Sequence, residues 1–336
     1  MPAEPASFPA VASVLPVASI DALGTRIAVI RAAIRTMIFG QHEVVDLTLI
    51  TLLAGGHVLL VGVPGLGKSR LVETLGVVMG LDTNRVQFTP DLMPADITGS
   101  EVLDDIDGRR SFRFIKGPVF CQLLMADEIN RASPRTQSAL LQAMQESRVA
   151  IGGVEHRLPQ PFHVLATQNP IEQEGTYPLP EAQLDRFLLE INVTYPDLAA
   201  ERTMLLATTG IERPKPTAVM DAAELLAAQA LLRRMPVGEK IVEAILDLVR
   251  AGRPEITDDD HVSRHIAWGP GPRAAQALML ACRARALLDG RLAPSLDDVA
   301  ALARPVLRHR MALNFSARAD GMQLATVIDR LVERLG

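Results

Sequence analysis

The feature that most restricts the fold is a glycine-rich loop between a predicted strand and a predicted helix. The apolar run His57-Val58-Leu59-Leu60-Val61 leads directly into Gly62-Val63-Pro64-Gly65-Leu66-Gly67-Lys68-Ser69. The stretch from Lys68 to Gly80 then has helical spacing and ends at a glycine. A short apolar strand, a glycine-rich turn and a helix in this order are typical of an α/β domain with a parallel sheet.

The same loop has the composition of a phosphate-binding site. It fits the pattern G-x-x-x-x-G-K-[ST] in full. Its glycines allow backbone N–H groups to turn toward phosphate oxygens, and the following helix directs the positive end of its dipole at them. We expect Lys68 to bridge the β and γ phosphates and Ser69 to coordinate Mg²⁺. The strand before the loop and the helix after it favour this interpretation over an ordinary glycine-rich turn.

Further strand and helix signals complete an α/β domain. Two helical segments, from Ile20 to Phe39 and from His42 to Ala54, precede the first strand. Four more segments are predicted as strands of the same sheet: Arg85 to Phe88, Leu123 to Ala126, His163 to Thr167 and Leu188 to Val193. Two segments, 101–118 around Asp107-Gly108 and 148–158 around Gly152-Gly153, alternate apolar and polar residues and are predicted as inserted β-hairpins.

The C-terminal third has helical patterns without clear strand signals. The expected helices are Ala222 to Arg234, Lys240 to Arg250, Arg273 to Leu288, Ser295 to His309 and Asp320 to Leu335. We therefore expect three parts: a flexible tail over residues 1–19, rich in Pro, Ala and Ser, a nucleotide-binding domain over 20–195, and a small all-helical domain over 196–336.

Composition excludes several classes of protein. The chain has 34 Lys and Arg against 39 Asp and Glu, a net charge of −5, which is not the basic excess expected of a protein that mainly grips nucleic-acid backbones. Cys121 and Cys282 offer neither a disulfide framework nor zinc-ligand spacing and favour a cytoplasmic location. The N-terminus lacks the pattern of a signal peptide, and no run of 18 apolar residues predicts a membrane span.

Two adjacent acids extend the prediction from nucleotide binding to hydrolysis. Asp127 and Glu128 end the apolar run that begins at Leu123. In that position the first acid can hold Mg²⁺ and the second can polarise the attacking water. A helix N-terminus that favours acids is the alternative. The complete phosphate loop upstream makes the catalytic interpretation the stronger one.

At this point the chain resembles a known family, the MoxR branch of the AAA+ ATPases, from Ile20 to Gly336. The resemblance rests on Gly55 to Leu60, Gly62 to Ser69, Gln87 to Gly99, Asp127 to Ala132, Ala166 to Pro170 and Leu179 to Phe187. It implies an αβα ATPase core, a helical lid, and a ring, usually a hexamer, with ATP between neighbouring subunits. It also implies chaperone-like action on client proteins, often with metal cofactor insertion into a metalloenzyme, and a von Willebrand A-domain partner. The two predicted hairpins stand where this branch carries inserts that face the ring pore or the client.

The resemblance assigns further roles in the site. Asn169 matches the polar sensor, Arg186 the arginine finger that enters the neighbouring site, and Arg273 the sensor-2 arginine, which could act in its own or a neighbouring site. Arg131 is a second candidate for an intersubunit contact. From the residues alone, Asn169-Pro170 is typical of a turn and Arg186 of a helix end. Val61 and Ser69 differ from the acid and the threonine that many relatives have, but Ser69 keeps the hydroxyl ligand.

The residues expected to bind ATP or ADP come from the loop and from one earlier segment that we place against adenine. They are Gly40, Gln41, Gly62, Val63, Pro64, Gly65, Leu66, Gly67, Lys68, Ser69 and Arg70.

Two other functions share the same core. A nucleic-acid motor is kept open by the basic residues Arg109, Arg110, Arg113 and Lys116 in the first hairpin, although the acidic balance and 4% aromatic content argue against it. The second alternative function is that of a magnesium-chelatase-like subunit. Near the C-terminus, His309-Arg310 follows an apolar run and is interpreted as a packing feature.

Overall fold

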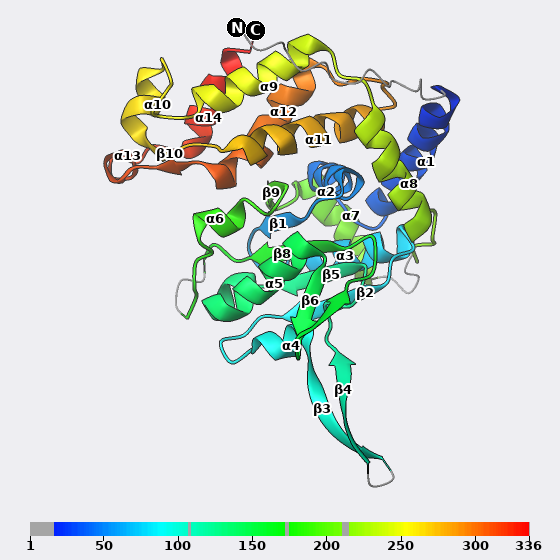
Figure 1. Ribbon diagram of the computed structural model, residues 1–336. Coiled ribbons are helices and arrows are strands. Elements are labelled where there is room, and N and C mark those ends of the chain that lie inside the picture. The colour runs from blue at the N-terminus through cyan, green and yellow to red at the C-terminus, as the bar shows by residue number, and fades with distance from the viewer. Residues whose placement is uncertain (1–16, 107–108, 172–174, 210–214, 336) are drawn as a thin grey trace, which may run out of the picture.

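The computed structural model describes residues 17–106, 109–171, 175–209 and 215–335. Among these residues, five strands form one parallel sheet that lies between layers of helices (Figure 1). In spatial order they are β2 (Thr83–Gln87), β5 (Leu123–Asp127), β8 (His163–Gln168), β1 (Val58–Val61) and β9 (Leu189–Asn192). Each lies within a few residues of its predicted range, so the α/β prediction is confirmed. Because the strands are parallel, their carboxyl ends share one edge of the sheet.

Strands β1, β5 and β8 are buried almost throughout, as their continuous apolar runs predict, whereas β2 buries only Val86. Along β1, Val58 and Leu60 belong to one core and Leu59 to the other. The first core is covered by α1 (Val17–Arg35), α2 (His42–Ala54), α3 (Lys68–Val78) and the C-terminal helices. The second is covered by α4 (Pro94–Thr98) and α5 (Pro134–Glu146).

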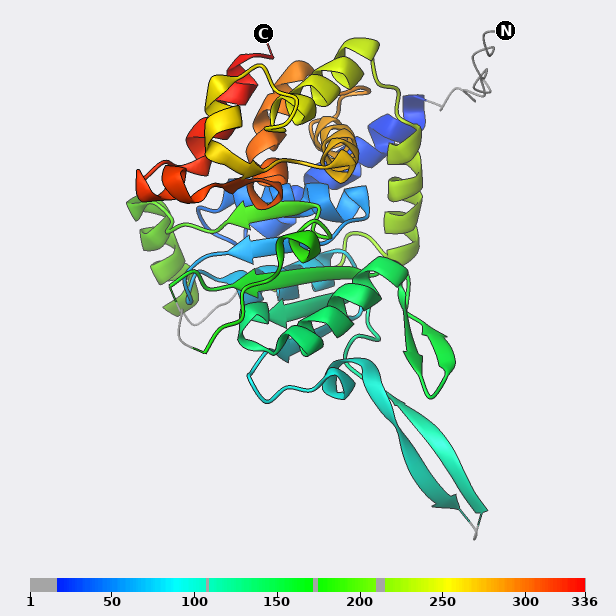
Figure 2. The ribbon, with the colours of Figure 1, turned by 60° about the vertical axis from the view of Figure 1, so that its left-hand side comes forward.

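Both predicted hairpins are present. The first pairs β3 (Gly99–Ile106) with β4 (Arg109–Lys116), and its expected turn, Asp107-Gly108, lies outside the described residues. The second pairs β6 (Arg148–Ile151) with β7 (Val154–Arg157). The first hairpin projects far from the body of the molecule on the side opposite the C-terminal helices (Figure 2). Phe114 of β4 stacks on His156 of β7 with ring centroids 4.1 Å apart, so the hairpins touch at their bases.

The C-terminal part is helical except for one small sheet. Its helices are α8 (Ala222–Arg234), α9 (Glu239–Ala251), α10 (Asp260–His265), α11 (Pro272–Leu288), α12 (Leu296–Leu307), η2 (Arg308–Arg310), α13 (Phe315–Ala319) and α14 (Leu324–Glu333). Strands β10 (Ile266–Trp268) and β11 (Ala312–Leu313) pair antiparallel. The expectation of an all-helical domain is wrong in this detail, because strands of two and three residues carry no periodic signal.

Three further helices lie between these parts: η1 (Ile129–Arg131), α6 (Glu181–Leu184) and α7 (Leu198–Thr209). Helix α1 begins at Val17, so the last three residues of the expected tail are helical, whereas residues 1–16 lie outside the described part. Within the described residues no helix is both long enough and apolar enough to cross a membrane.

Candidate active site

The phosphate loop joins the carboxyl end of β1 to the first turn of α3. Gly65 and Gly67 have positive φ values of 85° and 76°, which side chains other than glycine rarely adopt. A Cβ atom built on either would meet nothing within 4 Å, so there is free space beside the loop at both glycines. Lys68 Nζ donates a hydrogen bond to the Gly62 carbonyl at 2.5 Å. Burial lowers the pKa of the Lys68 ammonium, and the carboxylates of Asp127 and Glu128 oppose that shift.

A pocket of about 290 Å³ adjoins this loop. Its lining includes Gln41, the loop residues from Pro64 to Gly67, Arg70 and side chains of α7. Gln41 Nε2 donates to the Leu66 carbonyl at 2.9 Å. Gly40 does not line the pocket: a Cβ built there would lie 2.4 Å from Ala200 Cβ of α7, so Gly40 allows close packing beside the pocket. The structure therefore places Gln41, but not Gly40, where adenine contacts were expected.

The two acids lie at the carboxyl end of β5, on the same edge of the sheet as the loop. Thr167 of β8 connects them: its hydroxyl donates to Asp127 Oδ1 at 2.5 Å, and its oxygen accepts from the Glu128 N–H at 2.8 Å. Glu128 has φ 55°, in the left-handed region that costs a non-glycine residue free energy. Such strain persists only where the surroundings fix the residue, and here the Thr167 hydroxyl fixes it.

Strand β2 supplies two polar side chains that the sequence did not single out. Arg85 Nη2 donates to Asp127 Oδ2 at 2.6 Å, and Gln87 Nε2 donates to Glu128 Oε2 at 2.7 Å. Arg131 Nη1 also donates to Glu128 Oε2, at 3.1 Å. Arg85 and Gln87 are two residues apart on a strand that neighbours β5, and period-two alternation places them on the same face. That alternation was the signal that could have identified them.

Asn169 follows β8 at this edge and is 5% exposed. Its Oδ1 accepts from the Ile171 N–H at 3.1 Å, so the turn expected from Asn169-Pro170 does form. The turn and the sensor role are compatible, because β8 lies between β5 and β1, whose carboxyl ends carry the acids and the phosphate loop.

Arg186 and Arg273 lie at the opposite edge of the sheet. They line a second pocket, of about 260 Å³, together with Gly55, Gly56 and His57, which precede β1. Strand β1 has four residues, so about 13 Å of strand separates this edge from the phosphate loop. Arg186 precedes β9, which runs parallel to β1, and Arg273 begins α11. The structure therefore brings these two arginines together and keeps both away from the phosphate loop of their own chain.

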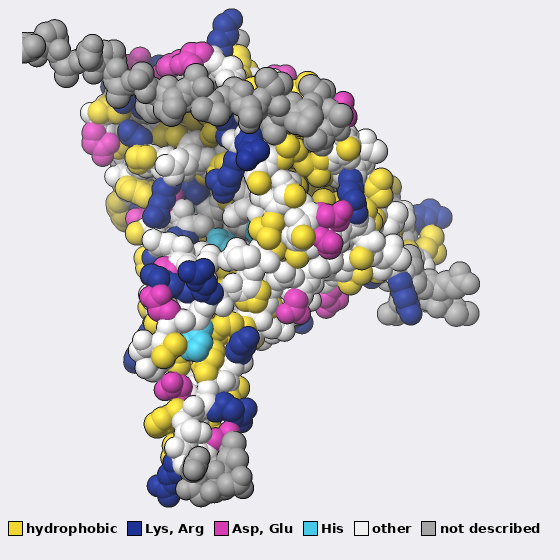
Figure 3. All heavy atoms as spheres, turned by 45° about the vertical axis from the view of Figure 1, so that its right-hand side comes forward, with side chains coloured by type: hydrophobic (Ala, Val, Ile, Leu, Met, Phe, Trp, Pro, Cys, Tyr) yellow, Lys and Arg dark blue, Asp and Glu magenta, His cyan; other side chains and the backbone are white. Residues whose placement is uncertain are grey.

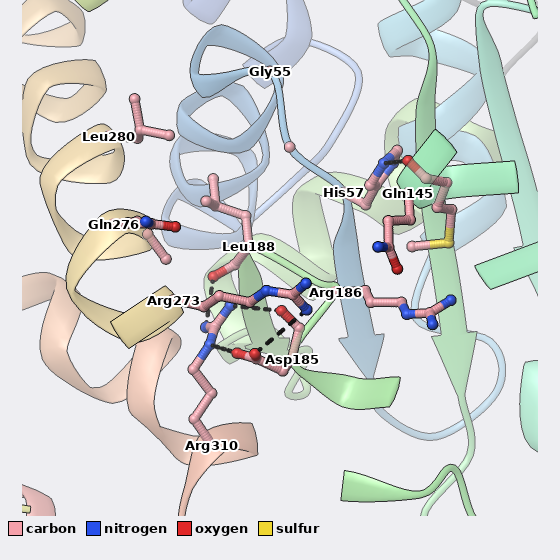
Figure 4. Close-up of a pocket in the computed structure, with 13 residues that line it drawn as sticks. Gly55, His57, Gln145, Asp185, Arg186, Leu188, Arg273, Gln276, Leu280 and Arg310 are labelled. Carbon is pink, nitrogen blue, oxygen red and sulfur yellow. Dashed lines mark hydrogen bonds and ion pairs between the residues drawn. The ribbon is translucent and has the colours of Figure 1, made fainter. Parts of the chain in front are cut away.

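The charges of this second pocket are unbalanced. Its lining contains Arg186, Arg273 and Arg310 but a single acid, Asp185. Burial lowers the pKa of the Arg186 guanidinium, and the nearby Arg273 lowers it further, while Glu146 opposes the shift. Arg273 Nη1 lies 3.7 Å from Asp185 Oδ2. Figure 4 shows Arg273 and Arg310 reaching Asp185 from the helical domain, whereas Arg186 extends away from that carboxylate. The pocket is suited to an anion.

Comparison with known proteins decides the family. The chain is 42% identical over 301 residues to the chaperone MoxR1 of Mycobacterium tuberculosis, covering 89% of this chain and 79% of that protein. This chain belongs to the MoxR family of AAA+ ATPases. It is also 34% identical over 300 residues to the protein MoxR of Paracoccus denitrificans, with 84% and 87% covered.

The domain matches agree with this MoxR-family assignment. Residues 57–189 match the family described as ATPases associated with various cellular activities, and residues 258–331 match the AAA lid domain. A crystal structure from Cytophaga hutchinsonii has a TM-score of 0.86 at 35% identity and covers 94% of this chain and 96% of that one. The fold is thus an AAA+ α/β core followed by a lid, and this MoxR-family chain is an ATPase.

The residues present fit a nucleotide with a divalent metal ion. The glycine-rich loop at the start of α3, with Lys68 in its first turn, can receive phosphates, and the adjoining apolar pocket is large enough for a base. Among the described residues, no group of three or more His, Cys, Asp or Glu side chains is arranged so that it could hold a metal ion.

Proposed function

We propose that this chain hydrolyses ATP at sites that two neighbouring copies complete together. The observation that carries the proposal is the separation of the site residues: the phosphate loop and the acids lie at the carboxyl edge of the sheet, and Arg186 and Arg273 lie at the amino edge. Phosphoryl transfer needs positive charge near the transferred phosphate. A second copy can supply that charge where the same chain cannot.

Within one copy the roles follow from position. Lys68 holds the β and γ phosphates, Ser69 and Asp127 hold Mg²⁺, and the ion neutralises charge on the phosphates when bound. Glu128 accepts a proton from the attacking water, and its backbone is fixed by Thr167. Asn169, beside these groups, orients the water.

The neighbouring copy contributes the arginines. Arg186 stabilises the charge that develops on the transferred phosphoryl group, an effect that can reach 10³-fold or more. Arg273 lies in the same pocket as Arg186, so it acts on the same nucleotide, and therefore in the neighbouring site. Repeated head-to-tail contacts of this kind close into a ring if the rotation between copies allows it. The family resemblance favours six copies and ATP with Mg²⁺ as the ligands.

Kinetics of Arg186→Ala test this proposal. The variant keeps its own phosphate loop, so we expect its affinity for a fluorescent ATP analogue to stay within about twofold of wild type. Turnover should fall by about 10³-fold. Analytical ultracentrifugation of the Glu128→Gln variant with ATP should show a closed oligomer. Wild-type turnover by Arg186→Ala, or an active monomer, would contradict the proposal.

The biological work that we propose is chaperone-like remodelling of a client protein. The first hairpin carries exposed apolar side chains, Leu103 at 51% and Phe112 at 71%, and projects from the body together with Lys and Arg side chains (Figure 3). A projecting apolar surface suits contact with another protein. A metalloenzyme that needs a cofactor is one class of client, and a von Willebrand A-domain protein is a proposed partner. Affinity capture with Glu128→Gln and ATP tests for either.

The structure gives less support to a nucleic-acid motor. Arg113 Nε donates to Asp104 Oδ2 at 2.6 Å, and Lys116 Nζ lies 5.5 Å from the centre of the Phe120 ring. Arg113 and Lys116 thus have partners within the chain. DNA that stimulates ATP hydrolysis in a salt-sensitive manner would restore this alternative, and stimulation by a porphyrin system would favour the chelatase-like one.

We also propose that the protein acts in the cytoplasm. This location rests on Cys121 and Cys282, which are both buried free thiols.

A further inference from the structure

Arg310 is a buried cation that the roles above do not use. It lies in η2 at the end of α12 and is 2% exposed. A buried guanidinium is costly unless every donor has a partner. Each of its five N–H donors does have one: Nε bonds Asp185 Oδ1 at 2.7 Å, Nη1 bonds the carbonyls of Val306 at 2.7 Å and Leu188 at 3.1 Å, and Nη2 bonds those of Phe187 at 2.6 Å and Asp185 at 3.3 Å.

Four of these five bonds end on one tetrapeptide, Asp185 to Leu188, which contains Arg186. The neighbouring His309 adds a fifth contact, from Nε2 to the Phe187 carbonyl at 3.0 Å. The helical domain therefore holds the backbone on both sides of Arg186. A segment with no regular secondary structure between α6 and β9 is fixed in this way by a side chain far away in sequence.

The carboxylate of Asp185 extends the same arrangement to Arg273. Oδ1 accepts from Arg310, and Oδ2 faces Arg273 at 3.7 Å. The ion pair between Arg310 and Asp185 is shorter and more buried than the pair between Arg273 and Asp185. Arg310 therefore fixes the carboxylate that attracts Arg273. Together with His309, it also holds carbonyl groups on both sides of Arg186.

We infer that Arg310 is a positioning residue: it presents Arg186 and Arg273 together to the nucleotide of the neighbouring copy and links the lid to the arginine finger. The inference rests on the proposed function, because it needs these arginines to act between copies. It predicts that loss of Arg310 lowers kcat, which depends on the arginines, and leaves nucleotide affinity unchanged, since affinity depends on the phosphate loop.

The test variant is Arg310→Met, which keeps an unbranched apolar stem but removes all donors. Arg304→Met is the matched control, since Arg304 pairs with Asp329 inside the lid. We expect Arg310→Met to lower kcat by about 100-fold, the size of effect that a misplacement of about 1 Å can have. Its affinity for a fluorescent ATP analogue should stay within about twofold, and Arg304→Met should behave as wild type in both assays.

Mixing separates positioning from a general loss of structure. Lys68→Ala subunits keep all three arginines, and Arg310→Met subunits keep the phosphate loop, so the mixture should regain activity that neither has alone. Wild-type kcat in Arg310→Met overturns the inference. So does a mixture that stays inactive while Arg186→Ala mixed with Lys68→Ala regains activity. If that second mixture also stays inactive, the proposed function itself fails.

A milder variant covers the case in which Arg310→Met does not fold. Asp185→Asn keeps an oxygen acceptor for Arg310 but removes the charge that attracts Arg273. We expect kcat to fall by about 10-fold with unchanged nucleotide affinity, and rescue by Lys68→Ala subunits. Wild-type kcat would refute the link from Arg310 through Asp185 to Arg273.

Discussion

Two histidines, of which His163 is buried and His57 is half-buried, should make this protein sensitive to mild acid. His57 and His163 lie at the amino edge of the sheet with ring centroids 6.5 Å apart. His57 Nδ1 accepts from the Val164 N–H at 3.0 Å, so its Nε2–H donates to the Met144 carbonyl at 3.2 Å. Burial lowers the pKa of His57 to about 3 and that of His163 to about 4, and for His57 the charge of His163 adds to the effect. Both rings are therefore neutral in the fold.

The sign of the pH effect follows from these lowered pKa values. The unfolded chain binds a proton at each ring below pH 6.5, whereas the folded chain does so only near pH 4 or below. The neutral rings make their full contribution to the free energy of unfolding above pH 6.5, and this contribution is lost as the pH falls toward 4. At about 1.36 kcal/mol for each pH unit, each histidine removes about 2 kcal/mol of the free energy of unfolding by pH 5. The pair removes about 4 kcal/mol, a large fraction of the stability of a typical domain.

Urea denaturation followed by circular dichroism at pH 7 and pH 5 measures this loss. The variant His57→Asn/His163→Asn is expected to be less stable at pH 7, but to lose about 4 kcal/mol less than wild type between the two pH values. His261→Asn, at an exposed histidine, is the control and should follow the wild-type curve. Equal losses in the wild type and the double variant would refute the reasoning, because the pH dependence would then come from other groups.

Three further substitutions test the chemistry and the packing of the site. Glu128→Gln should keep nucleotide affinity and lose at least about 100-fold in turnover, measured by phosphate release, and normal turnover would remove Glu128 from the mechanism. Thr167→Val removes the hydroxyl that connects Asp127 and Glu128 and should cost about 1–3 kcal/mol in urea denaturation; an unchanged midpoint would show that this hydroxyl does not stabilise the fold. Gly62→Ala places a Cβ 2.5 Å from the Val193 carbonyl oxygen, so we expect about 1–3 kcal/mol of destabilisation, and wild-type stability would show that the loop adapts.

Local sequence patterns predicted the strands of the parallel sheet, and they predicted the phosphate loop and the two acids of the candidate site. The predicted segments located all five strands of the parallel sheet within the described residues, because β1, β5 and β8 are continuous buried apolar runs and the segments are bounded by breakers. The phosphate loop and the two acids were evident because their chemistry depends on residues close together in the chain. The sequence analysis did not indicate α7, none of whose residues is buried.

Contacts between distant segments could not be predicted. Arg85 lies 42 residues before Asp127, and Arg310 lies 125 residues after Asp185. Only the order of strands and the position of the lid bring these pairs together. Arg310 was interpreted as a packing feature, since a cation after an apolar run has no local sign of its partner. The packing of Gly40 against Ala200, 160 residues later in the chain, is another contact that no local pattern indicates.

The most direct test of the central claim, that each site is shared between copies, is the ATPase rate of mixtures of two inactive variants. Lys68→Ala removes the phosphate half of the site and Arg186→Ala the arginine half. If the halves belong to neighbouring copies, a mixture forms interfaces with one intact phosphate loop facing one intact arginine, and hydrolysis returns with a maximum near equal proportions. A mixture that stays inactive at every ratio, although subunits exchange, would show that both residues act in the same copy and would contradict the claim.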